Sequence, residues 1–502
     1  MPVNDPAVFS FDFQSSLYIS ILLAVHLAFA VHILFTKTDR PTSALLWLIV
    51  IFAMPGVGVL LYLLFGINKL RSMRAIDKAT DEFGPSKEIL ANYFLMQNRY
   101  THRHDEDENG GSMQQSFRRI ISRILPESLP LTGNEIELLH DGTETYPAML
   151  EAINGAEHSI HMESYIINAD AAGKMILDAM QARARQGVEV KVMYDRFGSF
   201  KAMISGFFHR YNKCSPDNFR ITPFVRGKLI IPLMQLRNHR KLLIVDGKTA
   251  FIGGVNIQQT NDHGSGLPNK SLIHDLHCRI KGPAVSSLQF VYLRDWMSST
   301  KQSLDSLLNE NVFPEPEVNG ESVVRVIPSG PGQGPEASRN TFRASADCAQ
   351  NSLWIFTPYF VPDLSVIEEL CMAALRGVDV RVIVPEHNNS LLVNLASKSF
   401  YRKLIESGVR IFEKRGIFSH CKIMMVDGEF IMMGSSNFDI RSFELNLEID
   451  IMVEHGPFLE QVIRTLHGEM EKSREVNPDA VFNKSASREL IENIFSLLSP
   501  IL

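Results

Sequence analysis

The sequence predicts an α/β protein in which an N-terminal transmembrane helical hairpin precedes two tandem α/β units related by pseudo-twofold symmetry. Three observations predict this fold class. Two long apolar runs lie before residue 69. Beyond residue 131, a strand–helix–strand pattern occurs twice. A set of His, Lys, Asp, Gly and Asn residues recurs with the same spacing in both copies.

The composition is that of a globular protein with several domains. The chain has 502 residues, of which 45% are hydrophobic and 21% are charged, and this excludes a wholly disordered chain. There are 50 Lys and Arg against 56 Asp and Glu, and the resulting charge of −6 argues against a dedicated nucleic-acid binder. The five cysteines include no C-x-x-C pair, which excludes a disulfide framework and a cysteine zinc site and suits a reducing compartment.

The apolar runs at 17–35 and 44–65 are each long enough to cross a bilayer as a helix. A signal peptide is disfavoured because no Lys or Arg precedes the first run. Pro55-Gly56 within the second run predicts a kink. The loop between the runs has two basic residues and the segment after them has four, so the positive-inside rule predicts that both termini and most of the protein are cytoplasmic.

The segment "HRHDEDENGGS" at 102–112 interrupts a linker with helical patches. It is interpreted as a solvated polar loop, and a metal site at His102 and His104 is the less favoured alternative. The predicted domains are the hairpin at 1–68, the linker at 69–130, the α/β units at 131–310 and 320–484, and an amphipathic tail at 485–502.

Each α/β unit begins with the pattern of a βαβ element. The predicted elements are a strand at 158–167, a helix at 173–187 and a strand at 188–195, repeated as 351–361, 364–377 and 378–385. This alternation favours a largely parallel core in each unit. A repeat of this length in two copies indicates a duplicated domain and not a solenoid.

The repeated polar motif is the strongest functional signal. The first unit contains "NHRKLLIVDGKTAFIGGVN" and the second contains "SHCKIMMVDGEFIMMGSSN", so both have H-x-K-x(4)-D followed at a fixed offset by G-[GS]-x-N. A single buried His beside a Lys is more often structural, but packing does not require the same polar set twice. The candidate residues are His239, Lys241, Asp246 and Asn256 in the first unit, and His420, Lys422, Asp427, Ser435 and Asn437 in the second.

Strand geometry suggests how these residues act together. Residues two apart on a strand share a face, so His and Lys of each motif point the same way. Bringing the two units together about a pseudo-twofold axis creates one site with two His, two Lys and two Asn. Two cations and two amides suit a phosphodiester, and two His allow one to attack phosphorus while the other protonates the leaving oxygen. Without clustered carboxylates in the motif, a metal mechanism is disfavoured.

These motifs resemble those of the phospholipase D superfamily from residue 131 onward, and the whole chain is similar to the bacterial cardiolipin synthases. The similarity includes "RPTSALLWL" and "MPGVG" in the hairpin, "YDRFGS", "TPYFVPD", "NFDIRSFELNLE" and the terminal "LLSPIL". It implies two halves sharing one active site, a covalent phosphohistidine, no metal and no cofactor, with a mainly structural role for the motif aspartates. It also implies that a downstream acid in each half orients an imidazole, and Asp275 and Glu448 occupy the matching places. Gly254 stands where the second half has Ser435, so a hydroxyl contact is expected to be lost there.

The resemblance implies a membrane-bound phosphatidyltransferase that condenses two phosphatidylglycerol molecules into cardiolipin and glycerol. Its expected location is the bacterial cytoplasmic (inner) membrane as a multi-pass protein with cytoplasmic catalytic halves, and its expected partners are bilayer phospholipids and not nucleic acid. The catalytic residues do not distinguish this reaction from that of a phospholipase D-type lipid hydrolase or a phosphatidylserine synthase-like transferase. Two complete motifs disfavour a catalytically dead scaffold. His239 is favoured as nucleophile because the superfamily more often uses the N-terminal copy.

The aromatic-rich segment at 197–211 leaves two interpretations open. Phe207 and Phe208 would either enter the membrane interface or pack in the core. The sequence predicts neither the oligomeric state nor the acyl-chain preference.

Overall fold

The computed structural model describes residues 13–36, 41–66, 87–102, 113–224, 236–318, 320–331, 337–497 and 499. The chain divides into two compact units. One comprises Met1–Met73 with Lys228–Gln235, and the other comprises Arg74–Gly227 with Leu236–Leu502. The basic residues that predict the membrane orientation, and all of the polar 102–112 segment except His102, lie outside the described residues.

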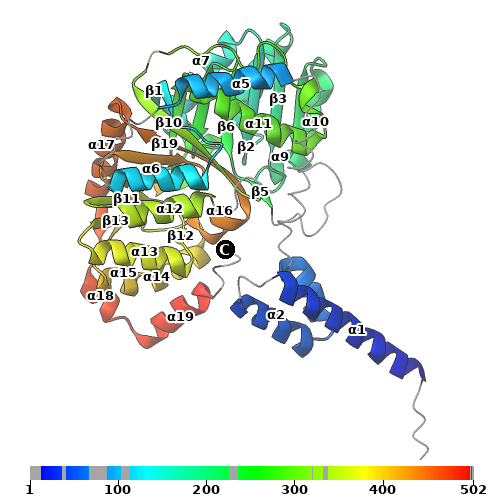
Figure 1. Ribbon diagram of the computed structural model, residues 1–502, viewed down its shortest axis with the longest axis vertical. Coiled ribbons are helices and arrows are strands. Elements are labelled where there is room, and N and C mark those ends of the chain that lie inside the picture. Colours follow the sequence, from blue (N-terminus) through cyan, green and yellow to red (C-terminus); the bar gives the residue numbers. More distant parts are fainter. Residues whose placement is uncertain are drawn as a thin grey trace, which may run out of the picture. The chain divides into compact units, whose positions relative to one another are not determined.

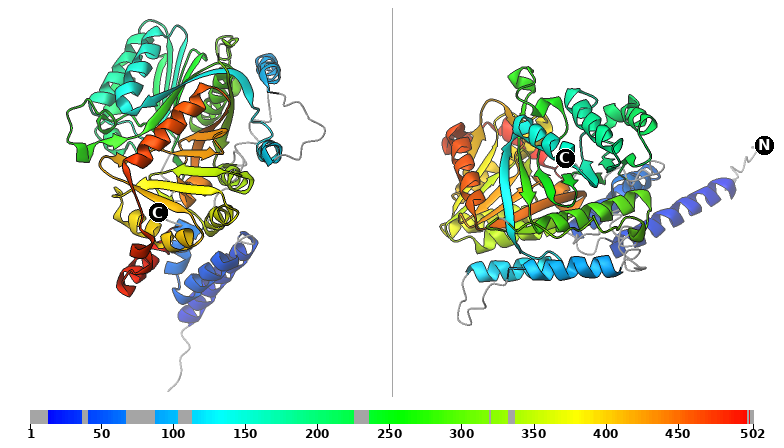
Figure 2. Two further views of the ribbon diagram at one scale, coloured as in Figure 1. Left: turned by 90° about the vertical axis from the view of Figure 1, so that its left-hand side faces the viewer. Right: turned by 90° about the horizontal axis from the view of Figure 1, so that it is seen from above.

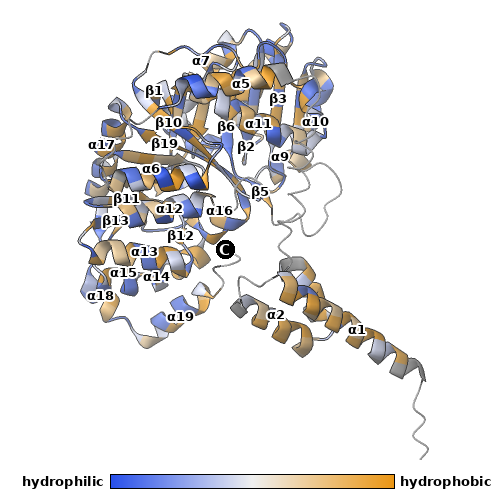
Figure 3. Ribbon diagram, in the orientation of Figure 1, coloured by the Kyte–Doolittle hydropathy of each residue, from blue (hydrophilic) through white to orange (hydrophobic). Residues whose placement is uncertain are grey.

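The described part of the N-terminal unit, residues 13–36 and 41–66, is helical and mostly apolar (Figure 3). Its elements are α1 (Phe13–Thr36), α2 (Pro41–Ala53), α3 (Val57–Leu61) and a π-helical turn η1 (Tyr62–Gly66). Within the described part of the chain, we find no helix with both the length and the apolar character needed to cross a membrane.

The predicted kink at Pro55-Gly56 is confirmed. The run predicted as one helix at 44–65 is broken between α2 and α3, where Gly56 has a φ of +78°. The Gly56 N–H donates a hydrogen bond to Nε2 of His26, at 3.3 Å, and the Nδ1 of His26 lies 2.6 Å from the Leu22 carbonyl oxygen in its own helix. A side chain of α1 therefore satisfies a backbone group that the break in the helix leaves without a helical partner.

The second unit contains both predicted α/β halves (Figure 1). The elements of the first half are β1 (Leu131–His140), α7 (Asp141–Gly155), β2 (Ser159–Ser164), α8 (Ala171–Ala184), β3 (Glu189–Tyr194), α9 (Phe200–Ile204), α10 (Phe207–Cys214), β4 (Phe219–Pro223), β5 (Arg237–Asn238), β6 (Lys241–Val245), β7 (Thr249–Gly253), η3 (Gln259–Asn261), η4 (Asn269–Ser271), β8 (Ile273–His274), β9 (Leu276–Lys281), α11 (Ala284–Thr300) and η5 (Leu304–Ser306).

The second half repeats the plan of the first. Its elements are β10 (Ser322–Ser329), α12 (Ala337–Cys348), β11 (Ser352–Phe356), β12 (Phe360–Val361), α13 (Leu364–Leu375), β13 (Asp379–Pro385), α14 (Leu391–Ser399), α15 (Tyr401–Glu406), β14 (Arg410–Lys414), β15 (Phe418–Ser419), β16 (Ile423–Val426), β17 (Phe430–Gly434), β18 (Phe438–Asp439), α16 (Ile440–Glu444), β19 (Asn446–Glu454), α17 (Pro457–Glu471), β20 (Ser473–Glu475), α18 (Pro478–Phe482) and α19 (Ala486–Ser496).

Equivalent side chains begin and end the corresponding helices of the two halves. The carboxylate of Asp170 accepts a backbone N–H at the start of α8, and that of Asp363 accepts two at the start of α13. Gly187 and Gly377 follow the two helices with φ values of +99° and +94°, the left-handed conformation that stops a helix before the next strand.

One continuous sheet joins the halves. From the antiparallel junction between β1 and β10, the first half runs outward as β1-β9-β7-β6-β2-β3-β4 and the second as β10-β19-β17-β16-β11-β13-β14, with β20 at the edge. The same order in opposite directions is the strand pattern expected for a pseudo-twofold axis at the junction.

The prediction of a largely parallel core is wrong in each half. Among the described strands of the main sheet, the parallel pairs inside a half are β2–β3 and β3–β4 in the first half and β11–β13 and β13–β14 in the second. β12 and β18 of the second half also pair in parallel, in a separate two-stranded sheet. The motif strands β6 and β7 form an antiparallel hairpin, as do β16 and β17. Three-residue loops that begin with Asp-Gly, at 246–248 and 427–429, connect these hairpins, and such short loops favour antiparallel pairing over a βαβ crossover.

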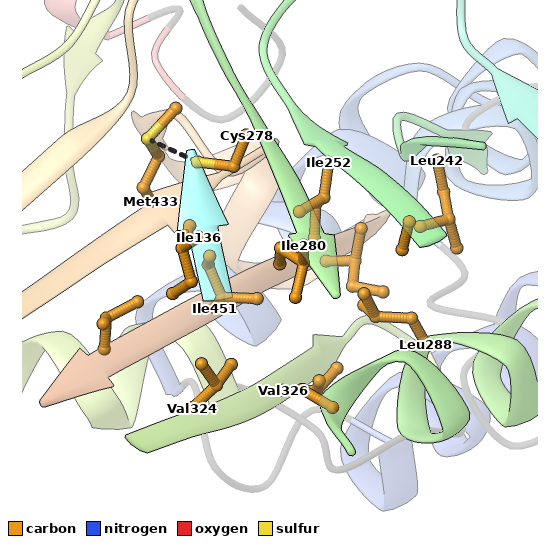
Figure 4. Packing of buried hydrophobic residues seen from close by; sticks show 14 of the residues in the cluster. Ile136, Leu242, Ile252, Cys278, Ile280, Leu288, Val324, Val326, Met433 and Ile451 are labelled. Carbon is orange, nitrogen blue, oxygen red and sulfur yellow. Dashed lines mark hydrogen bonds between the residues drawn. The ribbon is translucent and has the colours of Figure 1, made fainter. Parts of the chain in front are cut away.

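Helices cover both faces of the sheet, as Figure 2 shows. Successive residues of a strand point to opposite faces, so Leu242 and Ile244 of β6 lie in one core and Leu243 and Val245 in another. The first core is shared by both halves, and Figure 4 shows Cys278 of the first half beside Met433 of the second. Phe207 and Phe208 are buried in the second core, so of the two interpretations core packing is correct.

The predicted linker contributes two helices to the second unit. α5 (Lys87–Tyr100) buries Leu90 in the shared core, and its Gln97 hydrogen-bonds to Ser286 of α11 at 2.7 Å. α6 (Met113–Ile124) buries Phe117 and Ile121 against the second half. Within the predicted C-terminal tail, α19 packs on α14.

Candidate active site

The two motif histidines come from different halves and line one cavity. His239 immediately precedes Arg240 and β6, and His420 immediately precedes Cys421, Lys422 and β16. The cavity has a volume of about 560 Å³ and is also lined by Asn256 and Asn437. The structure thus brings the two predicted sets of His and Asn together in one place.

Short strand pairs between the halves hold the histidine backbones. β5 pairs with β19, and the His239 N–H donates to the Leu447 carbonyl at 2.9 Å. β15 pairs with β8, and the His420 N–H donates to the His274 carbonyl at 2.7 Å. Each histidine is therefore positioned by the half to which it does not belong.

The predicted acids contact the histidines across the same boundary. His239 Nδ1 lies 3.0 Å from Oε2 of Glu448, and His420 Nδ1 lies 2.7 Å from Oδ2 of Asp275. Each acid thus serves the histidine of the other half, not that of its own half as their order along the chain suggested. Because a carboxylate only accepts, Nδ1 carries the proton and Nε2 of a neutral ring keeps its lone pair.

The two motif lysines are buried beside the histidines. Lys241 Nζ donates to the His239 carbonyl at 2.6 Å, and Lys422 Nζ donates to the His420 carbonyl. Burial, with the charge of Lys422 adding to it, lowers the pKa of Lys241 to about 7. Burial likewise lowers the pKa of Lys422, although the carboxylate of Asp275 opposes this effect.

Burial also lowers the pKa of both histidines. The pKa of His420 falls to about 3, and Lys422 Nζ, 2.8 Å from Nδ1, contributes to this shift after burial. Burial alone would raise the pKa of Asp275 and Glu448, but the neighbouring His and Lys outweigh it and the pKa of both carboxyls is lowered. The site therefore holds carboxylates beside neutral imidazoles, and an anionic ligand would stabilise the charged form of its two buried lysines.

The motif aspartates bind backbone groups and do not line the cavity. Asp246 accepts hydrogen bonds from the N–H groups of Glu157, His158 and Ser159, all within 2.8 Å. Asp427 accepts from the three equivalent N–H groups before β11, within 2.9 Å. Both have a φ of +54°, so each aspartate shapes a hairpin turn and ties it to the neighbouring strand.

The asparagine amides lie at the cavity wall after β7 and β17. Oδ1 of Asn256 accepts the N–H of Ile166 at 3.2 Å, which directs its NH₂ group away from that backbone. Asn437 Oδ1 is buried without a hydrogen-bond partner among the described residues. Both side chains therefore keep polar groups available to a ligand.

The predicted loss of a hydroxyl at Gly254 has a geometric counterpart. Ser435 Oγ donates to Glu448 at 2.6 Å and accepts the N–H of Ile449 at 2.9 Å. A Cβ on Gly254 would lie 2.0 Å from Oδ1 of Asp275. The shorter acid of the first half occupies the space that a serine side chain would need.

Sequence reasoning missed two aromatic and two basic residues of the cavity. The ring of Tyr165 lies 4.8 Å from that of His239, and the ring of Tyr359 lies 5.8 Å from that of His420, both edge-to-face. Arg237 and Arg441 also line the cavity. Tyr165 directly follows β2 and Tyr359 lies three residues beyond the equivalent strand β11, so alignment of the two halves with a one-residue gap was the signal that would have found them.

The arrangement provides two oriented imidazoles, two amides and two guanidinium groups around one cavity, with two buried ammonium groups beside the histidines. This set suits nucleophilic attack on a phosphodiester with proton transfer to and from the oxygens it exchanges. Within the described residues, no group of three or more His, Cys, Asp or Glu side chains is placed to hold a metal ion.

Comparisons with known proteins identify the family of this chain. The family model described as "Cardiolipin synthase, PLD-like domain" matches residues 149–265 and 343–470, and "Phospholipase_D-nuclease N-terminal" matches residues 24–66. A cardiolipin synthase of Alkalihalophilus pseudofirmus is 32% identical over 96% of this chain and 94% of its own length. Cardiolipin synthase 1 of Bacillus anthracis is 29% identical over 97% of this chain and 94% of its own length.

A solved structure shares the fold. The phosphatidylserine synthase of Haemophilus influenzae Rd KW20 matches with a TM-score of 0.58 and 17% identity, covering 77% of this chain and all of that one. At this identity the likeness describes the arrangement of the two α/β halves and not the substrate.

Proposed function

The chain belongs to the cardiolipin synthase family of proteins with phospholipase D-like domains, and from this premise we propose that it condenses two phosphatidylglycerol molecules into cardiolipin and glycerol. The observation that carries the proposal is the convergence of His239 and His420 on one cavity, each with its Nδ1 held by an acid of the other half. This gives two Nε2 atoms at one cavity, one available as a nucleophile and the other for proton transfer.

The first step is a displacement at phosphorus. Nε2 of His239 attacks the phosphodiester of one phosphatidylglycerol, and a phosphorus–nitrogen bond forms as the bond to the headgroup glycerol oxygen breaks. His420, whose Nε2 takes up a proton when the negative phosphate enters the cavity, donates this proton to that oxygen, and glycerol leaves. The negative phosphate enters beside Lys241 and Lys422, and its charge raises the low pKa values of the buried cations so that they remain protonated.

The second step reverses the proton transfer. His420, now neutral, takes the proton from a headgroup hydroxyl of a second phosphatidylglycerol, whose oxygen attacks phosphorus. The phosphorus–nitrogen bond breaks, His239 is regenerated and cardiolipin is released. Bonds of the same kind break and form, so the reaction is near thermoneutral and reversible.

Two contacts support these assignments of the histidines. Nδ1 of His239 has both Glu448 Oε2 and the Ser435 carbonyl within 3.1 Å, which fixes the ring for attack by Nε2. The carboxylate of Asp275 lies closer to its histidine, at 2.7 Å, and this favours a transient positive charge on His420. N-terminal attack is also the usual choice in the superfamily.

The remaining residues of the set position the phosphate or the histidines. Asn256, Asn437 and the two lysines bind the phosphate oxygens, Ser435 orients Glu448, and the motif aspartates hold the hairpins that present the lysines. The cations and amides neutralise the charge that develops on phosphorus oxygens without a metal ion.

The N-terminal unit anchors the enzyme to the bacterial cytoplasmic membrane, with the catalytic halves on the cytoplasmic side. Support comes from the apolar runs at 17–35 and 44–65 and from large exposed apolar side chains on both helices, such as Leu34 and Leu45. An anchored site meets the hydroxyl of a second lipid at high effective concentration, which favours transfer to lipid over transfer to water.

Product analysis tests the proposal. Purified full-length enzyme in phosphatidylglycerol vesicles is expected to form cardiolipin and glycerol in equal amounts by mass spectrometry, and excess glycerol is expected to convert cardiolipin back. His239→Ala and His420→Ala are each expected to lower turnover by about a thousandfold or more, since each removes a reacting group. Exposed His209 supplies the control, because His209→Ala removes an imidazole outside the cavity.

Two results would contradict the proposal. Phosphatidic acid as the main product, without an effect of glycerol, would make the enzyme a hydrolase. Wild-type turnover in either cavity variant would show that the two halves do not share a site.

A further inference from the structure

The mouth of the cavity is bordered by an apolar surface that packing does not explain. On the first half, Phe197 and Ile204 are each 64% exposed, and Phe200 between them is exposed as well. Their spacing of three and four residues places all three side chains on one side of the segment that includes α9. Phe197 also lines the cavity, so this apolar surface continues to the site itself.

The exposed ring of Phe197 is held in place by the site. Oδ1 of Asp195 accepts the Phe197 N–H at 2.8 Å, while its Oδ2 accepts the N–H of Asn238, the residue before His239, at 3.0 Å. The guanidinium of Arg237 stacks over the ring at 4.4 Å. An aromatic side chain positioned this firmly and still exposed is arranged to contact something other than its own chain.

The second half has a matching feature in α14 and α19. Leu391 is exposed at the start of α14, between the cavity-lining residues Ser390 and Val393. α19 packs on α14, and its Phe495 contacts the buried cluster that includes Val361 and Val393, two residues of the cavity wall.

The outer side of α19 is apolar. Leu490, Ile491, Ile494 and Leu497 are exposed at the spacing of a single helix face, while Glu492 is turned inward and bound by Lys484 and Arg488. Figure 1 shows α9 and α19 on opposite sides of the region of β5, α16 and β12, whose residues or neighbours line the cavity.

We propose that this apolar rim, formed by Phe197, Phe200 and Ile204 on one half and by Leu391 and the exposed face of α19 on the other, docks onto a phospholipid bilayer. The inference rests on the proposed function and adds the surface that presents the site to its substrate. The rim is apolar, whereas Arg237 and Arg441 line the cavity within it. Apolar residues outside and cations inside complement the acyl chains and the anionic headgroup of one lipid molecule.

The docked rim lets a substrate enter without leaving the bilayer completely. The headgroup moves into the cavity while the acyl chains remain against the rim, so only the polar part of the lipid is desolvated. Both substrates of a condensation reaction need this access. The apolar rim provides it because one part of the rim lies on each half.

The test compares two forms of the same substrate with matched charge substitutions. Ile204→Glu and Leu490→Glu each place a carboxylate on the rim, and Leu95→Glu places one on α5, outside the rim. The wild-type exposures are nearly equal, at 64%, 61% and 63% respectively. Full-length variants are assayed on phosphatidylglycerol vesicles and on short-chain phosphatidylglycerol below its micellar concentration.

For each rim variant, the ratio of vesicle to short-chain turnover is expected to fall at least about fivefold, because a charge in the interface opposes burial of the rim. Leu95→Glu is expected to keep the wild-type ratio. An unchanged ratio in the rim variants, or an equal fall on both substrates, would overturn the docking surface. Loss of a cross-linked dimer in Leu490→Glu, with an unchanged ratio, would instead make α19 an interface between two copies. A wild-type enzyme inactive on both substrates would overturn the proposed function itself.

Discussion

Gly254 is the residue at which the two halves of the site differ most, and the difference is steric. Because glycine has no side chain, Gly254 leaves room for Asp275 Oδ1, whereas an added Cβ would approach that oxygen to 2.0 Å. In the second half, Ser435 and the longer Glu448 solve the same problem with a hydroxyl–carboxylate hydrogen bond of 2.6 Å. Each acid thus depends on the residue opposite it.

We expect Gly254→Ser to lower turnover by about a hundredfold, because the new side chain pushes Asp275 away from His420. Ser435→Gly removes the two hydrogen bonds of the Ser435 hydroxyl without a clash and is expected to cost about tenfold or less. Turnover measured on vesicles, with circular dichroism to confirm folding, checks both. Near-wild-type activity of Gly254→Ser would show that Asp275 can move without affecting its histidine.

The pH dependence of the enzyme follows from Lys241. Its pKa is lowered to about 7 by burial and by Lys422, so kcat/KM is expected to fall as pH rises above about 7 and the ammonium is lost. Stability is expected to change in the opposite direction. Unfolded lysine titrates near pH 10, so between about pH 7 and about pH 10 the unfolded state binds the additional proton and the free energy of unfolding rises with pH.

Activity and thermal unfolding profiles from about pH 6 to about pH 10 check this prediction, with Lys241→Met as the variant that lacks the titrating group. The unfolding profile of Lys241→Met is expected to be flatter than that of the wild type. Constant kcat/KM up to about pH 9 would mean that Lys241 remains charged in the working enzyme.

The residues of the site were predictable from the sequence where they recur at the same spacing in both repeats. His239 and His420, with their lysines and asparagines, stand at identical spacing in two copies, and polar identity in a duplicated pattern is visible without a structure. The crossed pairing of Asp275 and Glu448 was not predictable. It depends on the two-residue strand pairs β5–β19 and β8–β15, which are too short to leave a periodic signal.

At the scale of elements, the helices before the catalytic halves do more than connect. α6 buries Phe117 and Ile121 in the core of the second half, and its Arg118 pairs with Glu454 of β19 at 2.9 Å. Residues 113–124 therefore behave as part of the α/β fold.

Two adjacent isoleucines of α6 allow the contribution of packing to stability to be measured separately from that of helix propensity. Ile121 is fully buried, whereas Ile120 is 37% exposed. Ile121→Ala is expected to destabilise the second unit by about 2–5 kcal/mol, because it removes a buried side chain and leaves a cavity. Ile120→Ala, with the same chemical change, is expected to cost much less, and thermal unfolding of both variants measures the difference. Equal effects would mean that α6 contributes only its helix.

The elements of the βαβ part were predicted well, and the motif hairpins were not. Strand and helix signals around Gly187 and Gly377 correspond to real elements, because alternating apolar runs and helix-ending glycines are local features. The antiparallel half of each sheet was missed. Its direction is decided by the turns at Asp246 and Asp427. The Asp-Gly pairs at 246–247 and 427–428 are a hairpin signal in the sequence, but the interpretation as βαβ units did not use them.

At the scale of the whole molecule, the catalytic unit has one continuous sheet and a core shared by both halves. In the proposed mechanism, side chains from each half, including Lys241 and Lys422, balance the charge of the bound phosphodiester. We therefore expect turnover in a chelator such as EDTA to equal turnover without it. Loss of activity on chelation, restored by added Mg²⁺ or Mn²⁺, would contradict this expectation.

The crossed pairs constrain how this sequence can change over generations. A carboxylate encoded in one repeat is useful only through a histidine encoded in the other, so a substitution at 448 is selected through its effect at 239, and one at 275 through its effect at 420. A gene with a single repeat would build a working pair only by self-association of its product. Fusion of two repeats removes that requirement. It also allows the two halves to differ, as Gly254–Asp275 differs from Ser435–Glu448, whereas two identical chains would carry the same residues at both places.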